Sequence, residues 1–130
     1  MWEGWSLARI ILMFTGVLLL VVSVQVTLFH YRQNFRHWAM WGPVIGAPVT
    51  GVLAIMMALF NIGWLQPILA VILVLDVVSG LVGFGYHFEG VGERVDGYRM
   101  QNFLVGPPVT LPLMVSAMGV LGLLALYWRW

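Results

Sequence analysis

Apolar residues fill four long stretches of the chain, and short polar segments separate them. The four stretches cover about 7–29, 44–61, 65–86 and 104–128. A helix of about 20 apolar residues crosses a hydrocarbon core of roughly 30 Å, so each stretch is long enough to form a transmembrane helix. The pattern therefore predicts an all-α integral membrane protein with one four-helix transmembrane domain over residues 1–130.

The connections predict how these helices pair. Only a few residues around Gly63 join the second stretch to the third, so these two helices must be antiparallel neighbours. Four crossings place both termini on one face and the two polar loops, 30–43 and 88–103, on the other. We expect two helical hairpins, one over about 7–61 and one over about 65–128.

A short match suggests that the hairpins are repeats of each other. Ile45–Thr50 (IGAPVT) resembles Val105–Thr110 (VGPPVT), sixty residues later. A histidine that ends an apolar stretch precedes each match: His30 in the first hairpin and His87 in the second. Because both hairpins start on the same face, this predicts a parallel tandem repeat related by an axis along the membrane normal.

Composition excludes several classes of protein. Hydrophobic residues make up 62% of the chain and charged residues 8%, a balance that fits neither a soluble domain nor a disordered segment. A net charge of +1 offers no basic surface for nucleic acid, and the absence of Cys excludes disulfides, Cys-ligated zinc and iron–sulfur clusters. No catalytic motif of known spacing occurs, so we expect that the protein is not an enzyme.

Arginine and tryptophan positions predict an orientation. Four Arg lie on the loop face and two on the terminal face: Arg32, Arg36, Arg94 and Arg99 against Arg9 and Arg129. The positive-inside rule therefore places the loops in the cytoplasm and both termini on the opposite side. Every Trp falls at a predicted interface: Trp2, Trp5, Trp64, Trp128 and Trp130 on the terminal face, Trp38 and Trp41 on the loop face.

Asp76 is the one acidic residue within an apolar stretch, with Leu75 and Val77 on either side. An ionised carboxylate at the bilayer centre costs roughly a few kcal/mol or more, so Asp76 should face protein and is a functional candidate. One interpretation makes it the midplane site of a small oligomeric transporter. The other is structural: a protonated Asp76 donates to a hydroxyl at similar depth, such as Ser116 or Thr15, or to a carbonyl of its own helix.

His30 and His87 form the second candidate site. Two imidazoles on facing helices can ligate a haem, and a chlorophyll-type pigment needs only one. Gly80, Gly83 and Gly85, just before His87, would let a flat macrocycle approach the helix backbone. The alternative is that both are ordinary interfacial histidines. No spacing of His and acidic residues predicts a metal-ion site.

The charged residues of the polar loops have three interpretations. Arg32 and Arg36 in the first loop face an acidic second loop that carries Glu89, Glu93 and Asp96. They form a clasp between the hairpins, a docking surface for a soluble partner, or a solvated face. Exposed ion pairs are worth about 0–1 kcal/mol each, so a clasp would set geometry more than stability.

Small residues predict close helix packing. Ser79 and Gly83 fit the small-x-x-x-small pattern, and Gly119 and Gly122 recur with Ser116 along the fourth stretch. Such surfaces drive helix association in lipid. A bundle this small should bury only some of them internally, which leaves the remainder for other chains.

The segment from Gly85-Tyr86-His87 to Gly106-Pro107-Pro108 resembles small multi-span bacterial membrane proteins to which no function is assigned. The resemblance implies a membrane bundle, for which we expect the bacterial inner membrane, and it transfers no functional residue. The leading hypothesis is a non-catalytic accessory subunit of a larger respiratory, photosynthetic or transport complex, with lipid, other integral membrane subunits or further copies as partners. The alternatives are a haem- or chlorophyll-binding electron-transfer or pigment protein and the transporter built on Asp76.

Overall fold

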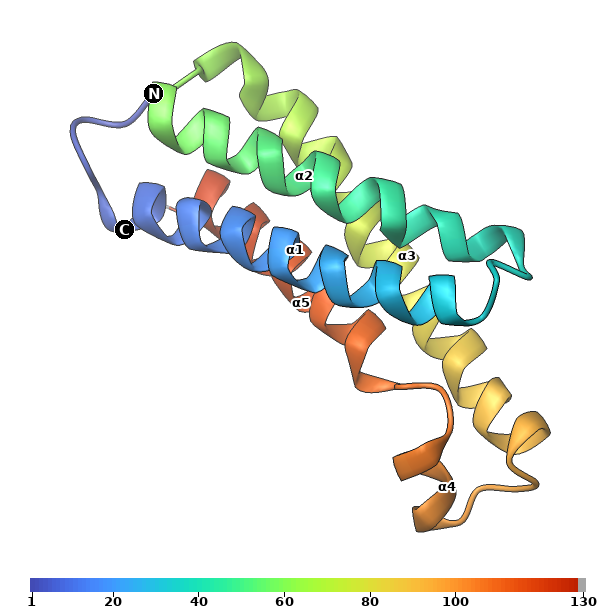
Figure 1. The fold of residues 1–130 in the computed structure, drawn as a ribbon. Helices are drawn as coiled ribbons and strands as arrows, with labels where there is room; N and C mark the ends of the chain where they lie inside the picture. The colour runs from blue at the N-terminus through green and yellow to red at the C-terminus, as the bar shows by residue number, and fades with distance from the viewer. Residues whose placement is uncertain (129–130) are drawn as a thin grey trace.

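The computed structural model describes residues 1–128, which form helices and connecting turns without a β-strand (Figure 1). The elements are α1 (Leu7–Arg32), η1 (Trp38–Met40), α2 (Trp41–Phe60), η2 (Gly63–Leu65), α3 (Gln66–Arg94), α4 (Met100–Val105) and α5 (Thr110–Tyr127), where η marks a short 3-10 turn. Four helical segments are long and apolar enough to cross a membrane: α1, η1 with α2, η2 with α3, and α5. The predicted all-α class with four long apolar helices is confirmed.

Local sequence explains where the long helices begin and end. The Ser6 side chain caps α1 by accepting from the backbone N–H of Arg9 at 3.3 Å. Pro67 lies in the first turn of α3, where a missing N–H costs nothing. Asn61 ends α2 in the left-handed conformation (φ 53°), which Asn tolerates better than most residues.

The third helix is longer than predicted. We expected it to end near residue 86, but α3 continues to Arg94 and places Glu89 and Glu93 on a helix instead of a loop. At about 1.5 Å per residue, its 29 residues extend roughly 43 Å, well beyond the thickness of a hydrocarbon core. The predicted loop 88–103 is therefore wrong over much of its length, since it also contains the start of α4.

The four long helices pack in a ring. Within each half of the chain, α1 packs against α2 and α3 against α5; α1 then meets α5, and α2 meets α3. The start of α1 and the end of α5 lie together at one end of the bundle, which we call the terminal end (Figure 1). The opposite end, which carries η1 and α4, is the loop end.

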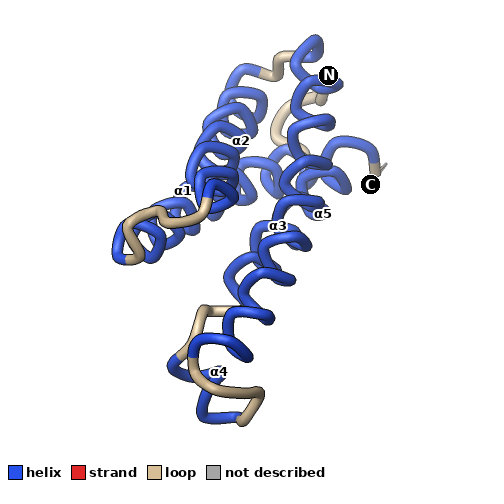
Figure 2. Tube along the Cα trace, turned by 90° about the vertical axis from the view of Figure 1, so that its right-hand side faces the viewer, coloured by secondary structure: helices blue, strands red, loops and turns tan. Residues whose placement is uncertain are grey.

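The hydrophobic core sits at the terminal end. A buried cluster joins all four long helices there, with Leu12 from α1, Met57 from α2, Leu69 and Leu73 from α3, and Leu126 from α5. Towards the loop end the two hairpins diverge. In Figure 2, α1 and α2 run together along one arm of a V, and α3 runs along the other arm. The core therefore fixes the hairpins at one end and leaves space between them at the other.

Glycines let the helices of each hairpin approach closely. A Cβ on Gly16 of α1 would lie 2.8 Å from the Gly51 carbonyl of α2. On α5, a Cβ on Gly119 would lie 2.8 Å from the Leu73 carbonyl of α3, and one on Gly122 would meet the Leu73 side chain at 2.7 Å. Small residues of α5 that we expected to remain available to other chains are thus used inside this chain.

Polar contacts close the terminal end. The Arg9 guanidinium donates through Nε to the Ala58 carbonyl and through Nη2 to the Leu59 carbonyl at 2.8 Å, so a cation caps the carboxyl end of α2. Asn61 binds the backbone of Trp2 twice, accepting from its N–H at 3.0 Å and donating to its carbonyl at 2.8 Å. The N-terminal segment is thereby tied to the first hairpin.

The two matched hexapeptides adopt different conformations. Ile45–Thr50 lies within α2 and Pro48 is accommodated in the helix, whereas Val105–Thr110 runs from the end of α4 to the start of α5. The second copy contains Pro107 followed by Pro108, and a residue before proline is disfavoured in the α conformation. One substituted position, Ala to Pro, is the local reason for the break.

Tryptophans in the described part of the chain lie at or beside the ends of the long helices, as predicted. Trp2 and Trp5 precede α1, Trp38 lies in η1, Trp41 begins α2, Trp64 lies in η2 and Trp128 follows α5. Arg129 and Trp130, which the orientation argument assigned to the terminal face, lie outside the described residues.

Candidate functional site

A cleft of about 600 Å³ lies between the diverging hairpins at the loop end. One wall comes from the end of α1, from η1 and from the start of α2; the other comes from the second half of α3 and the start of α5. This volume is within the range of about 300–1,000 Å³ that small-molecule sites occupy. Gly80, Gly83, Gly90, Pro107 and Pro112 line the second wall, where the glycines are packed closely against the two prolines and Ser116.

His30 lies in this cleft, in the last turn of α1. The residue is only 6% exposed, and its Nδ1 atom is buried without a hydrogen-bond partner. Phe35, which follows the end of α1, packs against the imidazole edge at a centroid distance of 6.4 Å. A buried nitrogen with no hydrogen-bond partner is uncommon in a folded protein.

His87 faces His30 from the second hairpin. Their ring centroids lie 6.3 Å apart with an interplanar angle of 74°. The Nδ1 atom of His87 lies 2.8 Å from the Pro108 carbonyl, so Nδ1 carries the proton and Nε2 holds the free lone pair of the neutral ring. The structure thus brings the two predicted histidines together. His87 also lies further inside its helix than expected, because α3 continues for seven residues beyond it.

Aromatic rings and polar groups form the mouth of the cleft. His37 lies between Trp38 at 5.8 Å and Tyr86 at 5.1 Å, centroid to centroid. Its own Nδ1 accepts from the Ala39 N–H at 3.2 Å and caps η1. The third histidine of the chain is therefore committed to local structure, unlike His30 and His87.

The clasp between the hairpins differs from the ionic clasp that the sequence suggested. In residues 1–128, neither Arg32 nor Arg36 pairs with Glu89, Glu93 or Asp96. A neutral residue joins the two sides instead: the Gln33 side-chain oxygen accepts from Arg94 Nη1 at 3.0 Å and from Arg36 Nη2 at 2.9 Å. Composition gave no signal for this role, because an isolated Gln at a helix end has no distinctive pattern.

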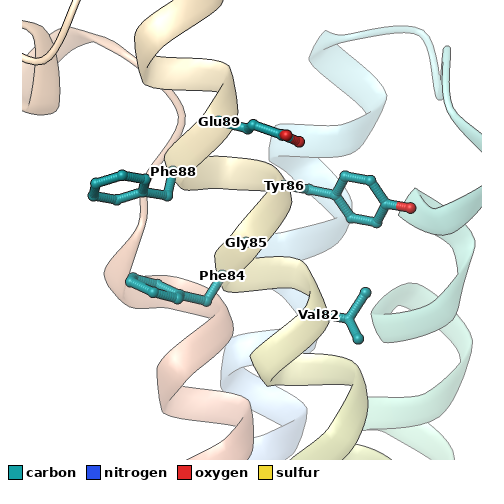
Figure 3. A pocket seen from close by; sticks show the side chains of 6 residues that line it. All are labelled: Val82, Phe84, Gly85, Tyr86, Phe88 and Glu89. Carbon is teal, nitrogen blue, oxygen red and sulfur yellow. The ribbon is translucent and has the colours of Figure 1, made fainter.

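A shallower depression of about 360 Å³ lies along α3 (Figure 3), and it shares Val82, Tyr86 and Glu89 with the cleft. Figure 3 shows Val82, Tyr86 and Glu89 on one side of the helix and Phe84 and Phe88 on the opposite side. Phe88 stacks on Tyr98 at 5.0 Å and lies 5.7 Å from Phe103, so these rings fix α4 against α3. This surface is open, and Glu89 points away from Phe84 and Phe88.

Asp76 lies apart from the cleft, buried at 4% exposure on the side of α3 that faces α2. Its Oδ1 atom lies against Gly46, where an added Cβ would be 3.3 Å away, and the Thr50 side chain is its hydrogen-bonding neighbour. The hydroxyls proposed as its acceptors have other contacts: Ser116 donates to the Val77 carbonyl at 2.8 Å and Thr15 to Ile11 at 2.9 Å. The Thr50 hydroxyl, which was not among the predicted partners, lies beside the Asp76 carboxyl group instead.

The remaining predicted packing residues line the seam between α3 and α5. A Cβ added to Gly83 would lie 3.2 Å from the side chain of Pro112. The Ser79 hydroxyl donates to the Asp76 carbonyl of its own helix at 3.2 Å. The closest contact in the seam belongs to Gly80, which we had considered only as a neighbour of the histidine. Among the described residues, no group of three or more His, Cys, Asp or Glu side chains is placed to hold a metal ion.

Comparisons with protein-family models, with curated proteins and with solved structures found no match to this chain.

Proposed function

We propose that the chain is an integral membrane protein that binds a haem-type macrocycle between its two hairpins, with His30 and His87 as axial ligands. Membrane insertion is supported by the four long apolar helices and by Trp at their ends. The observation that carries the ligand proposal is the approach of two imidazoles, from different hairpins, across a cleft of about 600 Å³.

Two histidines are too few to hold a bare metal ion but sufficient for a metal in a macrocycle. The macrocycle supplies the equatorial nitrogens, and the protein adds only the axial ligands. Their ring centroids lie 6.3 Å apart in the same cleft, so His30 and His87 are the residues that would hold the metal of a macrocycle bound there. The pairing of two rings favours a six-coordinate haem over a pigment that needs one ligand.

The hydrogen bonds of the histidines support this role. Metal-ligating histidines usually donate their second ring N–H to a carbonyl or carboxylate, which fixes the tautomer and the ring orientation. His87 has this arrangement, with Pro108 as the carbonyl partner and Nε2 left free. His30 offers the unpartnered Nδ1 atom described above, and Met40 is the polar backbone neighbour of its ring.

The chain's own residues would bind and orient the group and shield it from water. A haem bound here supplies one-electron redox chemistry. Gly80, Gly83 and Gly90 line the α3 wall, and their missing side chains let Pro112, Ser116 and Pro107 pack closely against it, which fixes the shape of that wall. At the mouth, Arg94 is the cation that can pair with a carboxylate on the macrocycle edge.

The test is a haemin titration of the purified chain in mild detergent, followed by absorption spectroscopy in the oxidised and reduced states. We expect one equivalent to give a low-spin bis-histidine spectrum. His30→Ala and His87→Ala should each abolish that spectrum, and free imidazole should restore it. His37→Ala is the matched control and should leave it unchanged, because His37 caps η1. A spectrum identical to haemin in empty micelles would refute the proposal.

The accessory-subunit hypothesis remains a proposal with less support than before. It rests on few polar groups, short loops, the absence of an enzymatic motif and small-residue surfaces, and of these surfaces Gly83, Gly119 and Gly122 face their own bundle. Gly119→Leu would consequently disrupt this chain itself and cannot test an external interface. Purification from native membranes, with mass spectrometry of polypeptides recovered in stoichiometric amounts, tests the hypothesis directly.

The tandem repeat and the orientation are also part of the proposal. The pairing of α1 with α2 and of α3 with α5, together with the facing histidines, supports two related hairpins. The Arg distribution supports loops in the cytoplasm. Cysteines introduced singly at the loop end and the terminal end of this Cys-free chain, and labelled with an impermeant reagent, test the orientation.

A further inference from the structure

The seam between α2 and α3 contains a carboxyl group that no charged residue neutralises. Asp76 is almost fully buried there, and its Oδ2 atom has no hydrogen-bond partner. Gly46 lacks a side chain at the point of contact, so the carboxyl group can lie directly against α2. No charged side chain of the described residues interacts with it, and Thr50 is its only polar side-chain neighbour.

The hydroxyl protons around this carboxyl group are all used elsewhere. Thr50 Oγ1 donates to the Gly46 carbonyl at 3.0 Å, and Ser79 Oγ donates to the backbone carbonyl of Asp76 at 3.2 Å. The hydroxyls on the other two long helices also donate to carbonyls: Ser116 on α5 to Val77, and Thr15 on α1 to Ile11. An ionised Asp76 would therefore receive a hydrogen bond only if the Thr50 hydroxyl gave up its bond to the Gly46 carbonyl.

A protonated carboxyl group does not need a donor from its surroundings. A carboxylic acid carries its own donor, and Thr50 Oγ1 retains a lone pair after donating to Gly46. An unpaired charge buried in protein costs far more than a neutral group with one hydrogen bond. We propose that Asp76 is a proton-binding site, in which the acid hydroxyl donates to Thr50 Oγ1 and links the two hairpins inside the bundle.

A sodium ion at the same place is chemically less well supported. A bound cation needs several oxygen ligands, and the one side-chain oxygen placed beside the carboxyl group, Thr50 Oγ1, already donates to the Gly46 carbonyl. The site also lies apart from the histidine cleft, so the proton proposal does not depend on a macrocycle.

The experiment uses the fact that the chain contains only two Asp residues, Asp76 and Asp96. Asp96 is exposed and has a positive φ of 62°, a conformation that Asn tolerates, so Asp96→Asn should leave the fold intact. With Asp labelled by ¹³C at the side-chain carboxyl, Asp76 is then the sole labelled group. Its infrared spectrum in liposomes at neutral pH reports its state without any change to Asp76 itself.

We expect an isotope-shifted C=O band of a carboxylic acid, and we expect the same band in the presence of sodium or potassium chloride. Bands of an ionised carboxylate at neutral pH would overturn the proposal, as would loss of the acid band on addition of sodium alone. Thr50→Val should shift the C=O band to higher frequency, because the acid loses its acceptor, whereas Ser79→Ala should leave it in place. An unshifted band in Thr50→Val would refute the assigned partner.

Discussion

Two glycines on α3, five residues apart, give the sharpest test of the helix packing. Gly80 faces α5: a Cβ there would lie 2.5 Å from the Pro112 carbonyl and 2.8 Å from the Ser116 N–H nitrogen, and it would also meet Ser116 Oγ. Gly85 faces open space, with nothing within 4 Å of an added Cβ. Both residues are helical, so the same substitution to Ala isolates the effect of the seam.

The two substitutions should change the free energy of unfolding in opposite directions. At Gly80, a methyl group meets backbone atoms, which cannot rotate away, so α3 and α5 must separate; overpacking of this kind costs about 1–3 kcal/mol. Displacing the Ser116–Val77 hydrogen bond costs about 1 kcal/mol more, and the higher helix propensity of Ala returns about 1 kcal/mol. Gly80→Ala should therefore lower the free energy of unfolding by about 1–3 kcal/mol, while Gly85→Ala should raise it by about 0.5–1 kcal/mol.

The assay is reversible unfolding of the purified chain in mixed micelles of a mild detergent and dodecyl sulfate, followed by Trp fluorescence. The seven Trp lie at or beside the predicted interfaces, so their emission reports on both ends of the bundle. If Gly80→Ala proves as stable as Gly85→Ala, the close approach of α3 to α5 is wrong.

Two further predictions concern the ends of the bundle. Arg9→Gln removes the cation that caps the last carbonyls of α2, and the free energy of unfolding should fall by about 1 kcal/mol, with a smaller loss for Arg9→Lys; equal stability of the wild type and Arg9→Gln would contradict the cap. Gln33→Ala removes the exposed link to Arg94 and should change stability by less than about 0.5 kcal/mol, yet broaden the distances between spin labels attached to cysteines introduced at Tyr31 and Met100. An unchanged distance distribution would show that Gln33 does not hold the hairpins at the mouth.

The sequence was sufficient to predict the four long helices, but it predicted their lengths less well. Long apolar stretches identify membrane-crossing helices because only a helix satisfies its own backbone in such a segment. The end of α3 escaped prediction because its last turns, with Glu89 and Glu93, are polar while the backbone stays helical to Arg94. Polar residues indicate where a helix leaves an apolar environment. The backbone can remain helical beyond that point, as it does in α3.

For individual polar residues, the sequence predicted their surroundings in part but not their hydrogen-bond partners. The apolar neighbours of Asp76 predicted that it faces protein, and the position of His30 and His87 at corresponding points of two hairpins suggested a shared site. Their partners depended on packing: Thr50 lies beside Asp76, and Pro108 binds His87, only because α2 and α5 dock at particular rotations against α3. A linear pattern contains no information about that rotation when every neighbouring helix offers a hydroxyl or a carbonyl.

By itself, the sequence determined the class of fold, the number of long helices, their antiparallel order and the residues that must avoid lipid, because hydrophobic length and the cost of burying charge act on each segment separately. Only the tertiary structure decided which glycines form seams, that Gln33 joins the hairpins where the sequence left a clasp, a docking surface or a solvated face open, and that the two hairpins diverge to leave a cleft around two histidines. These features depend on contacts between segments distant in sequence, and their energies exist only once the helices have packed.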